Sequence, residues 1–401
     1  MNVKEQRVIE SLRLGIPPEG YIREFTLGRL QEIATLTTTL QQPSSTALLL
    51  KANYGSGKSH LLKFIREEAL SIGYAVSFVT LDAKSAVRFN RMDQIFGAIC
   101  RGIEVPNTKD KGITAFFNWI LSRSRTGKIA ENWNRITNDQ RWSYSKAIKS
   151  PSIFIALRAW ESDRVDTNLI EDWLHQIGRS EGYSAAYLDR ELIRKPQIYF
   201  QEGLQTNGAL AWSSYTNKTS LFNFKHNAYA QAWDAVEDLD TLAKASNLRG
   251  LIILFDEFED VVYNISNIEH QKAAFQNLFK FFFGSFFKSP SFFAVTPGFV
   301  EKCKHRLIMK GHWDYDYRHF DTLPTFEMSP LDENNLQKLA DKIRQFHGIA
   351  YDWNSNTLSV GESLRRVVVK AASTPLQDRT RYTICEVVKC LDQLFEDNEY
   401  S

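Results

Sequence analysis

One short run of this sequence has the residue types and spacing that phosphate binding requires. It extends from Ala52 to Ser59, with an apolar segment at 47–50 before it and a helix-like pattern at 61–65 after it. Glycine and other small residues let backbone N–H groups approach phosphate oxygens closely, and the following helix points its N-terminus at the anion. The Lys58 ammonium would contact the β- and γ-phosphates, and the Ser59 hydroxyl would hold Mg²⁺.

This run, called the glycine loop below, matches the P-loop pattern with Ala52 at the position of the first Gly. That position needs only a small side chain. The alternative is a chance turn of Gly and Ser ahead of a helix, which the flanking segments argue against. We therefore predict a site for ATP and Mg²⁺, with nucleotide-binding residues Ala52, Asn53, Tyr54, Gly55, Ser56, Gly57, Lys58, Ser59 and His60.

An acidic motif follows another apolar segment. Residues 251–255 lead directly into Asp256 and Glu257. A carboxylate delivered beside the phosphates would hold the metal shell, the role expected of Asp256. The adjacent Glu257 would orient and polarise the attacking water, which nucleotide binding alone does not need, so we predict that it is catalytic. Glu259 and Asp260 are interpreted as the start of a solvated acidic helix.

Two further positions are expected to act on the terminal phosphate. Thr296 follows the apolar segment 292–295, and if the sheet resembles that of AAA+ proteins, a polar side chain at this strand end would face the γ-phosphate; ordinary turn chemistry is the alternative. Arg306 and Arg318 lie between this segment and the next, where an arginine could reach the nucleotide of a neighbouring subunit and neutralise transition-state charge. No motif fixes which of the two does so, and an ordinary surface arginine is the alternative for each. Arg318 is our candidate.

A helical pattern near the C-terminus offers one more arginine. Arg379 and Arg381 stand at the start of the helix-like segment 382–394. This is the place at which a lid domain supplies an arginine to the phosphates, and we prefer Arg381 for that role.

Apolar segments separated by helical patterns would position these motifs. The segments 47–50, 74–81, 251–255, 292–295 and 325–328 have the continuous hydrophobicity of parallel strands covered on both faces. The acidic segment comes long after the glycine loop, an order typical of AAA+ ATPases and their relatives. We predict an α/β P-loop NTPase of AAA+ type, with a parallel sheet, a large helical insertion and a C-terminal helical lid.

The same patterns divide the chain into four regions. Residues 1–105 hold N-terminal helices and the first part of the ATPase core, and residues 106–245 form a helical, aromatic-rich insertion. Residues 246–330 complete the core, and residues 331–401 form the helical lid.

Composition excludes several classes of protein. With 43% hydrophobic and 24% charged residues, the 401-residue chain is neither disordered, collagen-like nor a coiled coil. A formal net charge of +2 excludes a polybasic coat. The four Cys form no CxxC pair, so neither a disulfide scaffold nor a zinc site is indicated. The most apolar stretch, 279–287, is too short to cross a bilayer and no signal segment is evident, so we expect a cytoplasmic protein without a membrane partner.

A basic stretch lies within this balanced total. Residues 123–149 contain seven basic side chains against two acidic ones, with Trp133, Trp142 and Tyr144 interleaved. Basic groups suit phosphates and aromatic rings suit base stacking, so DNA is a candidate partner. The alternative, to which we give slightly more weight, is a solvated helical face with its rings turned inward. The basic residues are Arg123, Arg125, Lys128, Arg135, Arg141, Lys146 and Lys149.

Together these motifs resemble the BREX-system ATP-binding family, P-loop proteins of bacterial and archaeal phage-defence islands. The resemblance rests on the glycine loop and on three segments, which read ESLRLGIPP at 10–18, REFTLGR at 23–29 and GLIILFDE at 250–257. It extends over about 3–90, 226–330 and the lid. The pair Gly28-Arg29 resembles an element that covers the adenine in related ATPases, which makes Arg29 a further nucleotide-binding candidate.

The resemblance implies a Mg²⁺-dependent ATPase of a prokaryotic antiviral defence system, working beside a helicase or a DNA methyltransferase. ATP binding and hydrolysis would be coupled to assembly on DNA or on partner proteins, and we expect a homo-oligomer. The alternative function is a nucleotide-gated adaptor or DNA-binding module with little turnover of its own.

Overall fold

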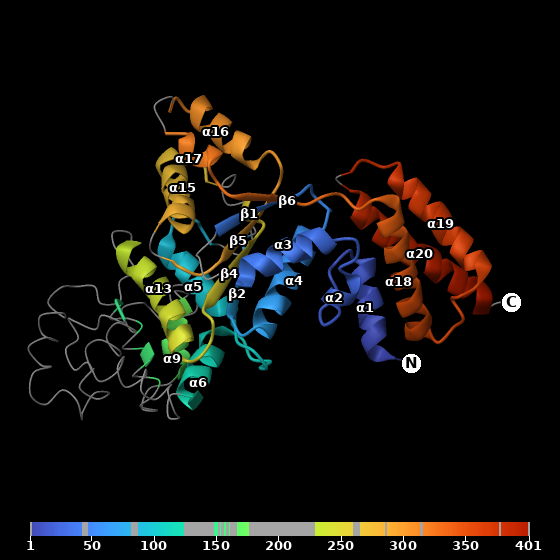
Figure 1. Cartoon of the computed structure of the whole chain (residues 1–401), viewed down its shortest axis with the longest axis horizontal. Helices are drawn as coiled ribbons and strands as arrows, with labels where there is room; N and C mark the ends of the chain where they lie inside the picture. The colour runs from blue at the N-terminus through green and yellow to red at the C-terminus, as the bar shows by residue number, and fades with distance from the viewer. Residues whose placement is uncertain are drawn as a thin grey trace, which may run out of the picture.

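A computed structural model gives the fold as a sheet with helices on both faces (Figure 1). The structure describes residues 2–41, 47–81, 87–123, 148–150, 153, 156–157, 160, 167–175, 229–259, 265–284, 287–312, 316–376 and 378–399. The predicted α/β class with a largely parallel sheet is confirmed.

Six strands form one sheet in the order β3-β2-β4-β5-β1-β6. All neighbours are parallel except β2 and β3, which pair antiparallel. The five predicted apolar segments are all strands, whereas the two-residue edge strand β3 was not predicted. The strands are β1 (Ala47–Lys51), β2 (Ala75–Thr80), β3 (Ile103–Glu104), β4 (Leu251–Asp256), β5 (Ser291–Val295) and β6 (Thr325–Glu327).

Helices cover the sheet and build a second lobe. Those before β4 are α1 (Val3–Arg13), α2 (Ile22–Phe25), α3 (Leu30–Gln41), α4 (Lys58–Ser71), α5 (Met92–Gly102), α6 (Gly112–Arg123), α9 (Thr167–His175) and α13 (Tyr229–Ala245). Those after it are α15 (Ile268–Phe283), α16 (Phe299–Met309), α17 (Arg318–Asp321), α18 (Glu333–Tyr351), α19 (Leu358–Ala372) and α20 (Arg379–Glu399). No helix in the described part of the chain is long and apolar enough to span a membrane.

The strand order brings the sequence motifs to one edge of the sheet. Strand β5 lies between β1, which leads into the glycine loop, and β4, which ends at Asp256. These three strands are parallel, so their C-terminal ends point the same way. The glycine loop, Asp256 and Thr296 therefore follow the same edge of the sheet, although long stretches of sequence separate them.

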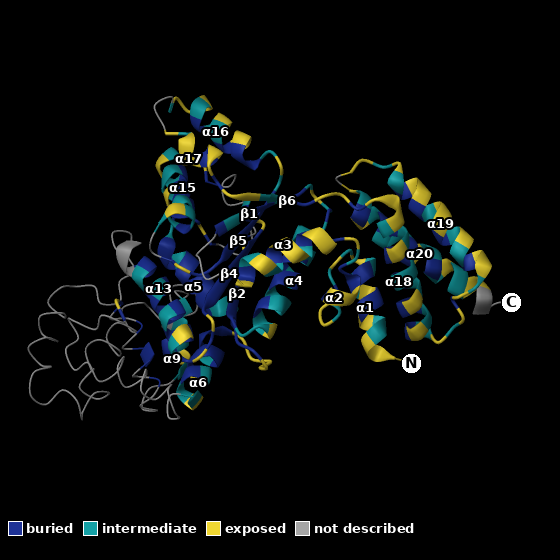
Figure 2. Ribbon diagram, in the orientation of Figure 1, coloured by how far each residue is buried: buried dark blue, intermediate teal, exposed yellow. Residues whose placement is uncertain are grey.

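Alternate residues of each central strand enter different hydrophobic clusters, one on each face. Ile253 and Phe255 of β4 pack with α5 and α15, whereas Ile252 and Leu254 pack with α3 and α4. Burial on both faces explains why the central strands are apolar throughout, and Figure 2 shows β4 and β5 in the dark blue of buried residues.

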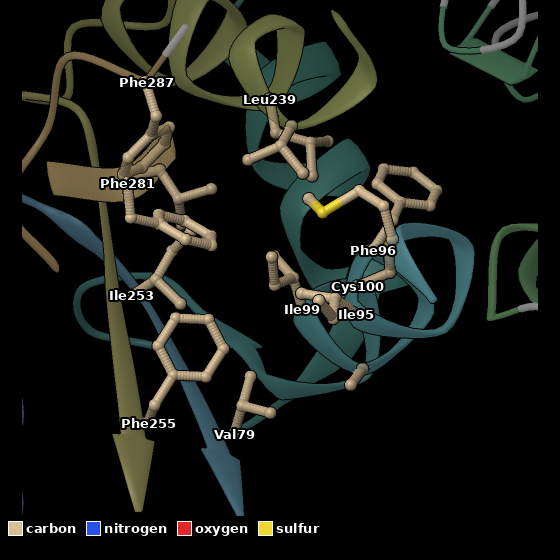
Figure 3. Close-up of a cluster of buried hydrophobic side chains, with 14 of the residues drawn as sticks. Val79, Ile95, Phe96, Ile99, Cys100, Leu239, Ile253, Phe255, Phe281 and Phe287 are labelled. Carbon is tan, nitrogen blue, oxygen red and sulfur yellow. The ribbon is translucent and has the colours of Figure 1, made fainter. Parts of the chain in front are cut away.

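Phenylalanines fill the cluster beneath α5 and α15 (Figure 3). Phe255 and Phe293 stack with ring centroids 4.6 Å apart and planes 16° apart. The ring of Phe281 contacts both of them edge-on and also meets Trp233 of α13, with centroids 4.7 Å apart. Many of the aromatic residues around β5 are thus core residues of the sheet lobe.

Described parts of the predicted insertion share this core. The helices α6, α9 and α13 contribute Phe117, Ile170 and Trp233 to the same cluster as β4. Asp240 of α13 accepts a hydrogen bond from the backbone N–H of Leu251 at 2.8 Å and one from the Ser289 hydroxyl. This buried carboxylate joins α13 to the start of β4 and to the segment before β5.

The lid lobe consists of α18, α19 and α20 together with the N-terminal helix α1 (Figure 1). The sequence-based division grouped α1 with the core, yet its residues Val8 and Leu12 pack among the lid helices. Arg13 forms an ion pair with Asp392 of α20 at 2.8 Å, and Asp392 also contacts the buried His347 ring at 3.1 Å. Apolar packing and ion pairing both attach α1 to the lid.

The aromatic cluster gives a prediction about stability. Phe281→Ala empties part of a close-packed core, and we expect it to lower the free energy of unfolding by about 3–5 kcal/mol. Phe283→Ala, on the same helix but with a 47% exposed side chain, should cost no more than about 1 kcal/mol. Urea denaturation of both variants measures the free energy of unfolding. Equal losses of that free energy would contradict the assignment of Phe281 to the close-packed core.

Candidate functional site

A cavity of about 250 Å³ lies between the sheet edge and the lid lobe. The glycine loop and the end of β4 form one wall, and α1, the segment after it and the lid form the other. The lining residues are Leu12, Gly15, Ile16, Pro17, Pro18, Phe25, Thr26, Leu27, Arg29, Tyr54, Gly55, Ser56, Gly57, Lys58, Ser59, His60, Asp256, Glu257, Glu259, Leu331, Leu339, Thr380, Arg381 and Ile384.

The glycine loop turns sharply before α4. Gly57 precedes the first residue of α4 and has φ = 97°, a left-handed conformation that side-chain-bearing residues rarely adopt. Within the loop, the Lys58 ammonium donates to the carbonyl oxygens of Ala52 at 3.0 Å and Asn53 at 3.4 Å. Burial lowers the pKa of Lys58, an effect that the negative charges of Glu259, Asp256 and Glu257 oppose. The loop therefore holds a partly desolvated cation at the cavity wall.

The end of β4 places two carboxylates beside this cation. Asp256 is 7% exposed and accepts a hydrogen bond from the backbone N–H of Glu257 at 3.0 Å. Burial raises the pKa of Asp256, an effect that the nearby Ser59 hydroxyl opposes. Ser59 and Asp256, both predicted metal-binding residues, thus line the same cavity, and their oxygens are the donor type that Mg²⁺ prefers.

Glu257 has an unusual backbone conformation. It has φ = 54°, which is uncommon for a residue other than glycine, and its exposed side chain lines the cavity. Such a conformation costs about 1–3 kcal/mol and is found where a functional site needs it. This backbone conformation was not predicted from the sequence.

Glu259 is the residue that sequence reasoning missed. Interpreted as part of a solvated helix, it instead lines the cavity, and its Oε2 accepts from the backbone N–H of Thr296 at 2.5 Å. The sequence signal that could have identified Glu259 was its position two residues after the predicted catalytic Glu257. Thr296 itself does not line the cavity, and its buried Oγ1 has no hydrogen-bond partner among the described residues. The γ-phosphate role of Thr296 stays a prediction.

Arg29 and His60 connect the N-terminal segment to the glycine loop. The Arg29 guanidinium donates to the carbonyl oxygen of Ser56 at 2.8 Å, so protein groups, rather than open space, surround it. The Nε2 atom of His60 lies 2.8 Å from the Thr26 hydroxyl oxygen. Both side chains line the cavity, but neither nucleotide-binding role is established by this geometry.

The lid arginines occupy different positions. Arg381 lines the cavity and packs closely against Gly15, whereas Arg379 donates to the carbonyl oxygen of Thr374 at 3.1 Å and lies outside it. Arg381 is therefore the lid arginine closer to the predicted phosphate position.

Arg318 lies outside the cavity. It begins α17, its side chain is 88% exposed, and it pairs with Asp316 at 2.8 Å. Arg306, the alternative finger, is half-buried on α16. Neither can act on the nucleotide of its own chain from here, so the role in a neighbouring subunit stays a prediction.

Most of the basic stretch lies outside the described residues, including Trp133, Trp142, Tyr144 and the basic residues Arg125, Lys128, Arg135, Arg141 and Lys146. At its two ends, Arg123 stacks on the Trp119 ring, with 3.2 Å between the guanidinium carbon and the ring centroid, and Lys149 pairs with Glu237 at 2.8 Å. Both end residues are engaged within the chain.

Comparison with known proteins gives one match. Residues 2–143 match the family model described as BREX system ATP-binding protein BrxC/D. This confirms the resemblance indicated by the sequence for the segment that holds Arg29, the glycine loop and His60. The match continues beyond residue 106 and ends before β4 and the lid, where the resemblance rests on residue motifs alone. No curated protein and no solved structure matched the chain.

His60 gives a prediction about pH. Burial, with the nearby charges of Arg29 and Lys63, lowers the pKa of His60 to about 4 from 6.5. Between these values the unfolded chain binds the proton and the folded chain does not, so stability falls as pH is lowered from about 6.5 towards 4. We expect His60→Gln to lose less stability than the wild type between pH 7 and pH 5.

Thermal unfolding across this pH range is the measurement. His305→Gln is the matched control, because His305 is exposed on α16 and should leave the pH dependence of the wild type unchanged. Parallel pH curves for wild type and His60→Gln would contradict the neutral state of the imidazole.

Proposed function

We propose that this chain, related to the BREX ATP-binding family over residues 2–143, is a Mg²⁺-dependent ATPase of a prokaryotic antiviral defence system. One observation carries the proposal. Lys58 and Ser59 from the glycine loop line the same cavity as Asp256 and Glu257 at the end of β4. A cation, a hydroxyl and two carboxylates at a helix N-terminus are the groups that nucleotide hydrolysis with a metal requires.

The strand order supports assignment to the AAA+ type. A strand, β5, separates the glycine-loop strand β1 from the acidic strand β4. The helical lobe after β6 adds Arg381 to the cavity opposite the glycine loop. Both features agree with an ATPase core that carries an extra central strand and a lid.

The residues of the cavity divide the chemistry among them. The Lys58 ammonium, now bonded to loop carbonyls, would exchange these partners for phosphate oxygens. Ser59 and Asp256 would hold Mg²⁺, which when bound would neutralise charge on the phosphates. The Glu257 carboxylate would accept a hydrogen bond from water and orient it, drawing a proton away as the water oxygen bonds to the γ-phosphorus and the bond from that phosphorus to ADP breaks.

Exchange of the predicted base tests hydrolysis. Glu257→Gln keeps the size and polarity of the side chain but removes its basicity, so we expect turnover to fall by roughly 10²-fold or more. ATP affinity should stay near that of the wild type, whereas Lys58→Ala should lose both binding and turnover. Phosphate release and equilibrium ATP binding are the two measurements.

Glu301→Gln is the matched control, because Glu301 is exposed on α16 and should leave turnover unchanged. Wild-type turnover in Glu257→Gln would contradict the catalytic assignment.

The second candidate function, a nucleotide-gated adaptor, predicts instead that the wild type itself retains ATP with negligible turnover, also when DNA is present. One observation favours the adaptor function. Arg318 is exposed outside the cavity, so a single chain would have no arginine finger at its own nucleotide site and would hydrolyse ATP slowly.

We further propose that the active species is a homo-oligomer in which Arg318 acts on the neighbouring site. Its 88% exposed side chain supports a role outside its own chain. Coupling of turnover to assembly on DNA or on a partner protein, such as a helicase or methyltransferase, is a proposal that rests on the family resemblance and on the basic stretch.

Complementation between two inactive variants tests this arrangement. Arg318→Ala should lower turnover by roughly 10³-fold, as loss of an arginine finger does. Mixed with Glu257→Gln, it should regain activity. Where the two variants are neighbours, the intact Glu257 of the Arg318→Ala chain meets the intact Arg318 of the Glu257→Gln chain. Steady-state turnover of the mixture is the measurement, and Arg306→Ala mixed with Glu257→Gln is the matched comparison. An inactive mixture, or full activity of Arg318→Ala alone, would contradict the proposal.

A further inference from the structure

We propose that Arg29 is a positioning residue, which fixes the direction of one phosphate-binding N–H without contacting the nucleotide base. Its guanidinium would hold the peptide between Ser56 and Gly57 so that the Gly57 N–H faces the cavity. The inference rests on the proposed function, because it assumes that phosphates bind at the glycine loop.

The guanidinium of Arg29 bridges two backbone carbonyls, with one terminal nitrogen on each, an arrangement called the fork below. One terminal nitrogen, Nη2, donates to Ser56 O at 2.8 Å, and the other, Nη1, donates to Ser329 O at 3.1 Å. Nη1 also faces Glu32 Oε1 at 3.4 Å. Arg29 is only 5% exposed, so loss of these partners would leave a buried charge unsatisfied.

The geometry of the peptide unit carries this constraint to the cavity. The peptide is planar and trans, so the Ser56 carbonyl and the Gly57 N–H point in opposite directions. Arg29 holds the carbonyl on one side, which turns the N–H to the other. No described residue accepts a hydrogen bond from the Gly57 N–H, so this donor is free to receive an anion.

Gly57 makes the constraint necessary. At φ = 97° and without a Cβ, this residue rotates more freely than any other type, so the loop alone does not fix the direction of its N–H. A Cβ at Gly57 would lie 3.9 Å from Arg29 Nη2, which shows how closely the guanidinium covers this peptide.

The second arm of the fork joins the glycine loop to the connection into the lid. Ser329 lies between β6 and α18, two residues before Leu331 of the cavity wall. The residue before Arg29 is also constrained, because a Cβ at Gly28 would clash with the Asn335 side chain of α18. Arg29 thus fixes the position of the phosphate-binding peptide relative to the start of the lid.

The test separates the phosphates of the ligand from its base. We compare ADP and adenosine binding to the wild type, Arg29→Lys and the double variant Arg29→Met/Glu32→Gln, in which Glu32 does not remain as a buried unpaired carboxylate. We expect the double variant to bind ADP roughly tenfold or more weakly, with adenosine affinity unchanged. Arg29→Lys keeps the charge but loses the fork, so an intermediate loss of ADP affinity is expected.

Two controls accompany these variants. Glu32→Gln alone isolates the effect of the carboxylate. Arg23→Met removes an arginine that also contacts α4, through Glu68 at 2.7 Å, but lies outside the cavity, and it should leave both affinities unchanged. Calorimetry measures ADP binding, and ligand-observed NMR measures the weaker adenosine.

Other outcomes would overturn the inference. Equal losses of ADP and adenosine affinity would mean that Arg29 contacts the base, and unchanged ADP affinity would mean that it positions nothing. If the double variant does not fold, Arg29→Lys decides between these outcomes. Failure of the wild type to bind ADP at all would instead refute the proposed function.

Discussion

Parallel pairing of β1, β5 and β4 is the constraint on which the cavity depends. It brings the glycine loop and the Asp256–Glu257 pair to one edge of the sheet, although they are far apart in sequence. The pairing persists because each strand is buried on both faces, with Phe255 and Phe293 stacked on one side. The charged groups of the site thus occupy fixed positions because the strands directly before them are held in an apolar core.

Burial gives these groups their chemical character. Lys58 and Asp256 are both partly desolvated, which lowers the pKa of the ammonium and raises the pKa of the carboxylic acid. Either group alone would be costly to keep charged in this place. Their opposite charges favour the charged form of each, and in the proposed function a polyphosphate with its metal would interact with both.

Local motifs were predictable from the sequence, whereas contacts between distant segments were not. The turn at Gly57 and the strand that ends at Asp256 are encoded by neighbouring residues. The amphipathic pattern of α1 indicated a buried face but did not identify the lid as the surface that covers it. Glu259 resembled any residue of an acidic helix, because its link to Thr296 depends on the pairing of β4 with β5. The strain at Glu257 likewise arises from its surroundings.

The docking of α1 on the lid has a mechanical consequence. The chain crosses between the two lobes between α1 and α3 and again between β6 and α18, so two covalent tethers join them. Two lobes joined by two chain segments can rotate about the line through those segments, whereas translation and twisting of one lobe relative to the other are restricted. The walls of the cavity belong to opposite lobes, so the angle of such a rotation would change the width of the cavity. A molecule that bridges the walls would set that angle, and the far ends of α19 and α20 would magnify the change.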